Sequence, residues 1–173
     1  MNNLAYTVDK NGTAFMIAFL REGKKFELIK ITSEGETETK PLDINGDLVF
    51  EKFQLLENNS GEIICVGYYA NGYDFKMSFG GGAALSFNTN GIYTFKMDNN
   101  GKVLSTSDIP FSLDLIKQYL SERQAEKMKK READGKAGIG DLRIKKIFPQ
   151  EDGSIIVIGE QQYMRNEYYG TSS

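Results

Sequence analysis

The side chains that could do chemistry in this chain are carboxylates and tyrosines, because the sequence has no histidine and only one cysteine. Histidine is the commonest general base and the commonest metal ligand, so its absence removes both roles in their usual form. Cys65 lies inside the apolar run 63–66, where a thiol packs as a small hydrophobic side chain. One thiol forms neither an internal disulfide nor a cysteine-rich zinc site. We therefore predict no metal and no cofactor.

Acidic residues gather at two places, and a pair of carboxylates is what a glycosidase needs. Glu34, Glu36 and Glu38 lie close together, and so do Asp43 and Asp47. Glycoside hydrolysis uses two carboxylates about 5–10 Å apart that flank the scissile bond. Both groups fall at turns and strand exits, where solvated acids are the ordinary case. We assign no catalytic residue and favour a non-enzymatic protein. The alternative is a carbohydrate-active enzyme that uses loop carboxylates.

Two further patterns resemble ligand-binding loops but lack a defining part. The turns at Asp9 and Asp98 look like the start of a calcium loop, which needs a bidentate glutamate at its twelfth position. Leu20 and Ile109 stand there instead. The glycines at 80–82 lack the lysine and the hydroxyl residue that follow in a phosphate loop. Turns and a flexible or bulged loop are the plainer interpretations.

The charge pattern excludes several classes of partner. The formal net charge is −3, and the basic run 127–131 lies between Glu126 and Glu132 without an aromatic residue. A nucleic-acid-binding surface normally carries a basic stripe, so we predict no nucleic-acid partner. No apolar stretch approaches the ~20 residues that span a bilayer, so we predict no membrane span. Residues 1–4 lack the charged-then-apolar pattern of a signal peptide.

Turn signals divide the chain into short strands. The dipeptide Asn-Gly is the strongest short-range hairpin signal. It occurs at 11–12, 45–46, 71–72, 90–91 and 100–101. The runs between the turns are rich in Phe, Tyr, Ile and Val, which is typical of strands. The sequence therefore predicts an all-β fold that is mainly antiparallel.

The hairpins also repeat. Segments 8–17, 56–67 and 148–159 each contain a strand end, a polar turn and an apolar strand. The second and third of these align closely, down to the glycine that ends the apolar run. A four-stranded antiparallel unit that repeats is typical of a β-propeller blade, and such units bury their faces by stacking.

We therefore predict that residues 1–173 form a single domain of propeller-like blades, which amounts to a partial propeller. The units cover about 4–42, 47–109 and 141–173, and the third stops after about two strands. An unfinished sheet exposes a strand edge, so self-association through open sheet edges is expected, or the chain is part of something longer.

Two insertions interrupt the units. Segment 72–90 is expected to be a long loop between the second and third strands of the second unit. Segment 112–135 is expected to form one inserted helix. Ser112 is a suitable N-cap, and apolar residues recur at helical spacing from Leu113 to Leu120.

Aromatic residues cluster after the apolar strands of the second and third units. If the units are stacked blades, equivalent positions lie on one rim, where tyrosines suit a glycan, peptide or protein partner. The other interpretation is that tyrosine simply fills strands well. The predicted ligand-binding residues are Tyr68, Tyr69, Tyr73, Phe75, Tyr163, Tyr168 and Tyr169.

The C-terminal half resembles a group of uncharacterised bacterial propeller-like proteins. The resemblance rests on residues 120–124 with their Lys/Glu-rich tail, on Leu142-Arg143, and on 150–163. It implies an exported protein of unknown function with a further hairpin beyond residue 173, and it brings no catalytic residues. Together with the repeats, it predicts a non-enzymatic binding or scaffold module, part of a larger exported protein, with a protein or glycan partner.

Overall fold

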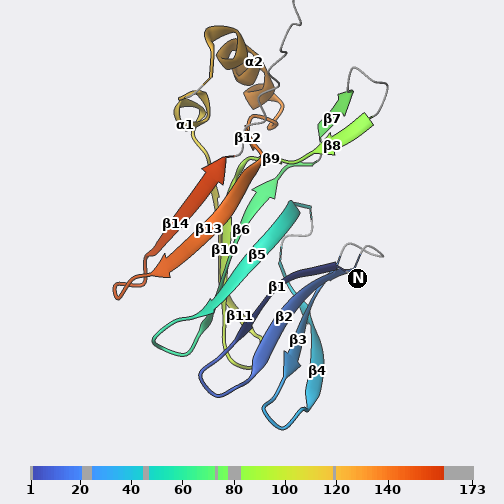
Figure 1. The fold of residues 1–173 in the computed structure, drawn as a ribbon, viewed down its shortest axis with the longest axis vertical. Coiled ribbons are helices and arrows are strands. Elements are labelled where there is room, and N and C mark those ends of the chain that lie inside the picture. Colours follow the sequence, from blue (N-terminus) through green and yellow to red (C-terminus); the bar gives the residue numbers. More distant parts are fainter. Residues whose placement is uncertain are drawn as a thin grey trace, which may run out of the picture.

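Antiparallel sheets packed face against face make up most of the chain. A computed structural model describes residues 2–20, 25–44, 47–72, 74–77, 83–118 and 120–161. All strand pairs in this part of the chain are antiparallel, as the turn and strand signals predicted. The described strands form two four-stranded sheets and three two-stranded ones. The helices lie together at one end of the molecule (Figure 1).

The first sheet is an up-and-down meander in the order β1-β2-β3-β4. Its strands are β1 (Asn2–Val8), β2 (Ala14–Leu20), β3 (Lys25–Ile31) and β4 (Thr37–Leu42). Phe26 and Leu28 point into the core, whereas the intervening Glu27 points away from it. This alternation is the period of two that a strand with one buried face requires.

The second sheet has the strand order β11-β10-β6-β5. Its strands are β5 (Val49–Glu57), β6 (Ile63–Ala70), β10 (Gly91–Met97) and β11 (Val103–Pro110). The segment between β6 and β10, which we predicted to be a long loop, contains a two-stranded hairpin and a further short strand. These strands are β7 (Asp74–Met77), β8 (Ala83–Ser86) and β9 (Asn88–Thr89).

The last described strands are β12 (Ile139–Gly140), β13 (Leu142–Pro149) and β14 (Ile155–Gln161). β13 pairs with β14, and β12 pairs with β9. We predicted one inserted helix before them, and this was wrong, because the segment forms α1 (Leu113–Lys117) and α2 (Glu122–Ala133). Ser121 begins the second helix, and its backbone N–H donates to the Gln124 side chain at 3.0 Å. This contact is half of a capping box, a helix-start signal that the sequence carried.

One type of five-residue turn closes five hairpins. In each, the first N–H donates to the fifth carbonyl at 2.8–3.0 Å, and the fourth residue is a glycine with φ between 80° and 87°. The turns are 9–13, 32–36, 58–62, 98–102 and 150–154. Asn11-Gly12 and Asn100-Gly101 occupy the third and fourth positions, so these predicted turns are confirmed. Asn45-Gly46 lies outside the described residues.

The prediction of a hairpin turn at Asn90-Gly91 was wrong. Gly91 begins β10, and a Cβ at this position would overlap the carbonyl oxygen of Ile109 and the ring of Tyr69. The glycine is therefore explained by close packing, and it has no positive φ.

The main core lies between the first and second sheets. It contains apolar residues from both sheets, with a chain of aromatic rings whose centroids lie 4.7–6.4 Å apart. Its buried members are Ala5, Phe15, Ile17, Phe26, Leu28, Leu42, Ile44, Phe50, Phe53, Leu55, Ile63, Cys65, Tyr69, Tyr93, Phe95 and Met97. The β13–β14 hairpin covers the opposite side of the second sheet, where the Gln54 side chain donates to the Ile144 carbonyl. Strand β6 is buried on both faces as a result.

Candidate functional site: the turn surface

The five turns lie together at one end of the sheets, the lower end in Figure 1. Each turn connects a strand to its next neighbour in an up-and-down pattern, so the topology brings these turns to the same edge. We call this edge the turn surface. Turn residues of each sheet also bind strand residues of the other sheet. Lys10 donates its backbone N–H to Glu57 at 2.7 Å, and Lys40 donates its ammonium group to the Asn100 carbonyl at 3.0 Å.

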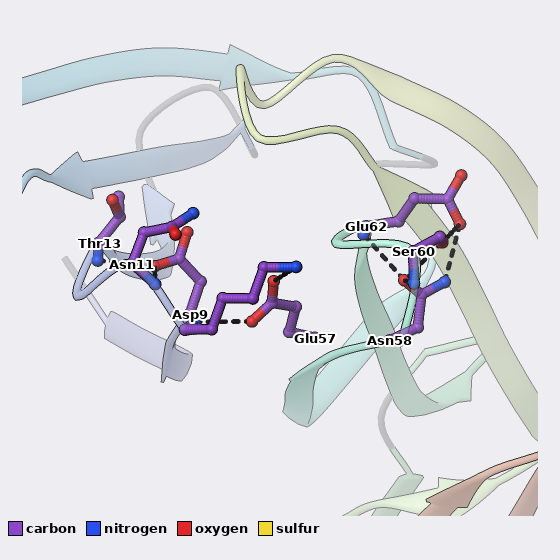
Figure 2. Close-up of polar contacts among 8 residues, drawn as sticks. Asp9, Asn11, Thr13, Glu57, Asn58, Ser60 and Glu62 are labelled. Atoms are coloured by element: carbon purple, nitrogen blue, oxygen red, sulfur yellow. Dashed lines mark hydrogen bonds and ion pairs between the residues drawn. The ribbon is translucent and has the colours of Figure 1, made fainter.

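The turns are built by their own polar side chains. Asp9 Oδ1 accepts hydrogen bonds from the backbone N–H groups of Asn11 and Thr13 at 2.9 and 2.8 Å (Figure 2). Asn58 and Asp98 repeat this pattern in their own turns. Asp9 and Asp98, at which calcium loops could have begun, thus serve as turn-closing acceptors. In the described ranges no three His, Cys, Asp or Glu side chains stand close enough to hold a metal ion.

A polar pocket of about 360 Å³ lies on the turn surface between turns 58–62 and 150–154. It is therefore bounded by the second sheet on one side and by the β13–β14 hairpin on the other. Ile64 and Pro149 supply its apolar part. The polar side chains that line it include Asn59, Ser60, Glu62, Lys96, Glu151 and Asp152.

Carboxylates outnumber cations in this pocket. Asp152 accepts a hydrogen bond from the Ser154 backbone at 2.9 Å, and hydrogen bonds from Ser154 lower the pKa of the Asp152 carboxyl. Glu62 accepts from the Asn58 amide at 2.8 Å and from the Ser60 hydroxyl at 3.2 Å (Figure 2). Ionised carboxylates are acceptors only, so the pocket is suited to a ligand that brings hydrogen-bond donors, such as hydroxyl or ammonium groups.

The acidic groups singled out in the sequence lie elsewhere. Glu34 and Glu36 are exposed members of turn 32–36, and Glu38 pairs with Lys40 at 3.0 Å. Asp43 and Asp47 are exposed in the segment of the chain that connects β4 to β5. None of these five carboxylates lines the pocket.

The structure separates the two tyrosines of β6. Tyr69 belongs to the core between the sheets, whereas Tyr68 lies on the opposite face and packs on Phe111 with ring centroids 6.2 Å apart. Burial raises the pKa of both hydroxyls, and the Asp108 charge adds to the effect at Tyr69. Successive side chains of a strand point to opposite faces, so the two cannot share one contact surface.

The other aromatic candidates have no described side chains. Phe75 lies in β7, where its backbone pairs with Leu85, but its side chain is outside the described residues. Tyr73, Tyr163, Tyr168 and Tyr169 also lie outside them. The assignment of the seven aromatic residues to a ligand stays a prediction.

Sequence reasoning missed Asn90, which joins the second sheet to the segment after α2. The Asn90 amide donates to the Ala137 carbonyl at 2.5 Å, and its side-chain oxygen accepts from the Asn71 N–H at 2.8 Å. Its backbone also bonds to Tyr69 and Phe111. The only signal in the sequence was the Asn-Gly pair, which indicates a turn far more often than such a junction.

Comparisons with protein-family models, with curated proteins and with solved structures found no match for this chain. In the part of the chain that the structure describes, no helix is both long enough and apolar enough to cross a membrane.

Proposed function

We propose that this chain is a non-enzymatic binding or scaffold module built from propeller-like blades, with its ligand held on the turn surface. The observation that carries the proposal is that equivalent strands of successive units point their equivalent side chains in the same direction. Alignment on the shared turn makes β2, β6 and β14 the second strands of three successive units. We call the side of a unit that points from the first sheet toward the β13–β14 hairpin its forward side, and the other its rear side.

Equivalent residues face the same way in all three units. Phe15 and Ile17 point forward from the first sheet into the core with the second sheet. Ile64 and Val66, at the matching positions of β6, are buried on the side covered by the β13–β14 hairpin. Three units that repeat both the turn and the direction of their side chains are what stacked blades require.

The polar pocket fits this arrangement because it lies between the turns of two neighbouring units. Loops at one edge of a stacked assembly vary without disturbing the sheets, so binding residues are often found there. Glu62, Glu151 and Asp152 are held at this edge with Lys96. We expect the ligand to be a polar segment of a protein or glycan that supplies donors to these carboxylates.

A carbohydrate-active enzyme is less well supported by the same pocket. A glycosidase needs one carboxyl group that donates a proton, and its pKa is raised for that purpose. The pKa of Asp152 is lowered instead, and Glu62 accepts hydrogen bonds from two neighbours. Both groups are therefore arranged as acceptors.

The proposal is tested by applying the labelled chain to a glycan array and to a library of random peptides. Binding should weaken at least tenfold in Glu151→Lys, which reverses a charge in the pocket. Glu34→Lys makes the same change in an exposed turn outside the pocket and should bind as the unaltered chain does. Turnover of chromogenic glycosides by the unaltered chain, or equal binding by both variants, would overturn the proposal.

A further inference from the structure

The forward side of the β13–β14 hairpin exposes apolar side chains that the other units bury. Ile156 and Ile158 are 50% and 47% exposed. Their equivalents in the second sheet, Ile64 and Val66, are 2% and 0% exposed. Phe148 pairs with Ile156 across the hairpin and extends the apolar face. The third unit therefore carries the forward face of a stacked unit without a described sheet on top of it.

The rear side of the first sheet shows the complementary situation. Tyr6 and Val8 are 73% and 58% exposed, and Tyr6 pairs with Met16 on the same face. Leu55 matches Tyr6 in the second unit, where it is 9% exposed against the first sheet. Inside the molecule, the rear side of the second sheet covers the forward side of the first sheet. The rear side of the first sheet is the equivalent face, and it is exposed.

We propose that the two faces bind each other between copies, so that the first sheet of one copy covers the β13–β14 hairpin of the next. The inference rests on the equivalence of units in the proposed function. The contact between copies would repeat the packing that joins the first sheet to the second within one copy. Tyr6 and Val8 of one copy would cover Ile156 and Ile158 of its neighbour. A head-to-tail contact of this kind closes into a ring or continues as a filament.

Charge disfavours the symmetric contact in which two hairpin faces would meet. The forward side of the hairpin carries Arg143, Lys145 and Lys146, of which Lys145 pairs with Glu160. Two such faces would bring uncompensated positive charges together, which costs free energy. On the rear side of the first sheet, Lys25 and Glu27 have opposite charges. A head-to-tail contact therefore avoids the repulsion that two hairpin faces would meet.

Light scattering during size-exclusion chromatography tests the inference on the whole chain. The unaltered chain should have at least twice its sequence mass of 19.4 kDa. Ile158→Glu should reduce this to the monomer mass, and so should Tyr6→Glu, because each places a charge on one of the two faces. Ile109→Glu is the matched control, because Ile109 is 53% exposed on β11 and lies on neither face. It should leave the mass unchanged.

Mixing the two variants decides the geometry. Ile158→Glu keeps an intact first-sheet face and Tyr6→Glu keeps an intact hairpin face, so the mixture should recover one contact and a dimer. A monomeric unaltered chain, an assembly that survives either variant, or a mixture that stays monomeric would overturn the inference. Circular dichroism of each variant separates loss of the contact from loss of folding. The pocket variant Glu151→Lys should keep the assembly, so failure of ligand binding and failure of association are seen separately.

Discussion

Single residues of β6 show how completely its surroundings exclude water. Cys65 is fully buried among apolar side chains, and burial raises the pKa of its thiol well above 9.0. The thiol therefore ionises at a higher pH in the folded chain than in the unfolded chain. Above pH 9 the unfolded state consequently binds fewer protons than the folded state. The free energy of unfolding is therefore undiminished below pH 9 and falls as pH rises further.

Between pH 9 and 10 we expect the free energy of unfolding to decrease by up to about 1.4 kcal/mol per pH unit. Urea unfolding at several pH values measures this slope. Cys65→Ala should be less stable throughout because it leaves a cavity, but its slope in this range should be flatter. An unchanged slope in that variant would assign the effect to other groups. Tyr68 and Tyr69 add to the decrease only above pH 10, since burial raises their pKa values from 10.0.

Sequence reasoning at this scale predicted the burial of Cys65, but it did not separate Tyr68 from Tyr69. The run around Cys65 predicted a buried strand, which β6 confirms. The contact of Tyr68 with Phe111 joins residues more than forty positions apart, and composition carries no signal for it. The pocket likewise depends on which two turns lie side by side, and only the stacking of the units decides that.

At the scale of elements, two glycines of the five-residue turns distinguish the cost of backbone strain from the cost of overpacking. Gly35 and Gly101 both have positive φ, which an L-residue adopts only with strain. A Cβ at Gly35 would have open space around it, whereas a Cβ at Gly101 would overlap the side chain of Leu28. The two turns therefore share a backbone cost and differ in packing.

Gly35→Ala should lower the free energy of unfolding by about 1–2 kcal/mol, the cost of left-handed backbone alone. Gly101→Ala should cost a further 1–3 kcal/mol or so, because it also overpacks against Leu28. Chemical denaturation of the two variants measures the difference. Equal losses would show that the core relaxes around the added methyl group.

The same elements mark the limits of prediction from the sequence. Alternating strands and Gly-containing turns are local signals, so they predicted the four-stranded first unit and the turns at Asn11-Gly12 and Asn100-Gly101. Asn90-Gly91 has the same local signal, but the close approach of Tyr69 and Ile109 gives it another role. Segment 112–135 was predicted to form one helix, whereas the contact between Ser121 and Gln124 begins a second one.

At the scale of the whole molecule, one contact that holds the β13–β14 hairpin on the second sheet is testable. Tyr68 reaches from β6 to the backbone of β14 at Gly159, where a Cβ would overlap its hydroxyl group. Glycine also ends the apolar strand at the matching position of the second unit, Gly67. The fit between Tyr68 and Gly159 thus helps to set the distance between two units.

Gly159→Ala should therefore lower the free energy of unfolding of the chain by about 1–3 kcal/mol through overpacking. In a Tyr68→Phe background the same substitution should cost clearly less, because the overlapping oxygen is gone. A double-mutant cycle by urea unfolding measures this coupling, which additive losses would contradict. Hydrogen exchange of β14 should accelerate in Gly159→Ala before that of β6, because β6 is hydrogen-bonded on both sides and β14 is described with one partner strand. That order would show that the stack opens at its third unit, where the inferred second copy would close it.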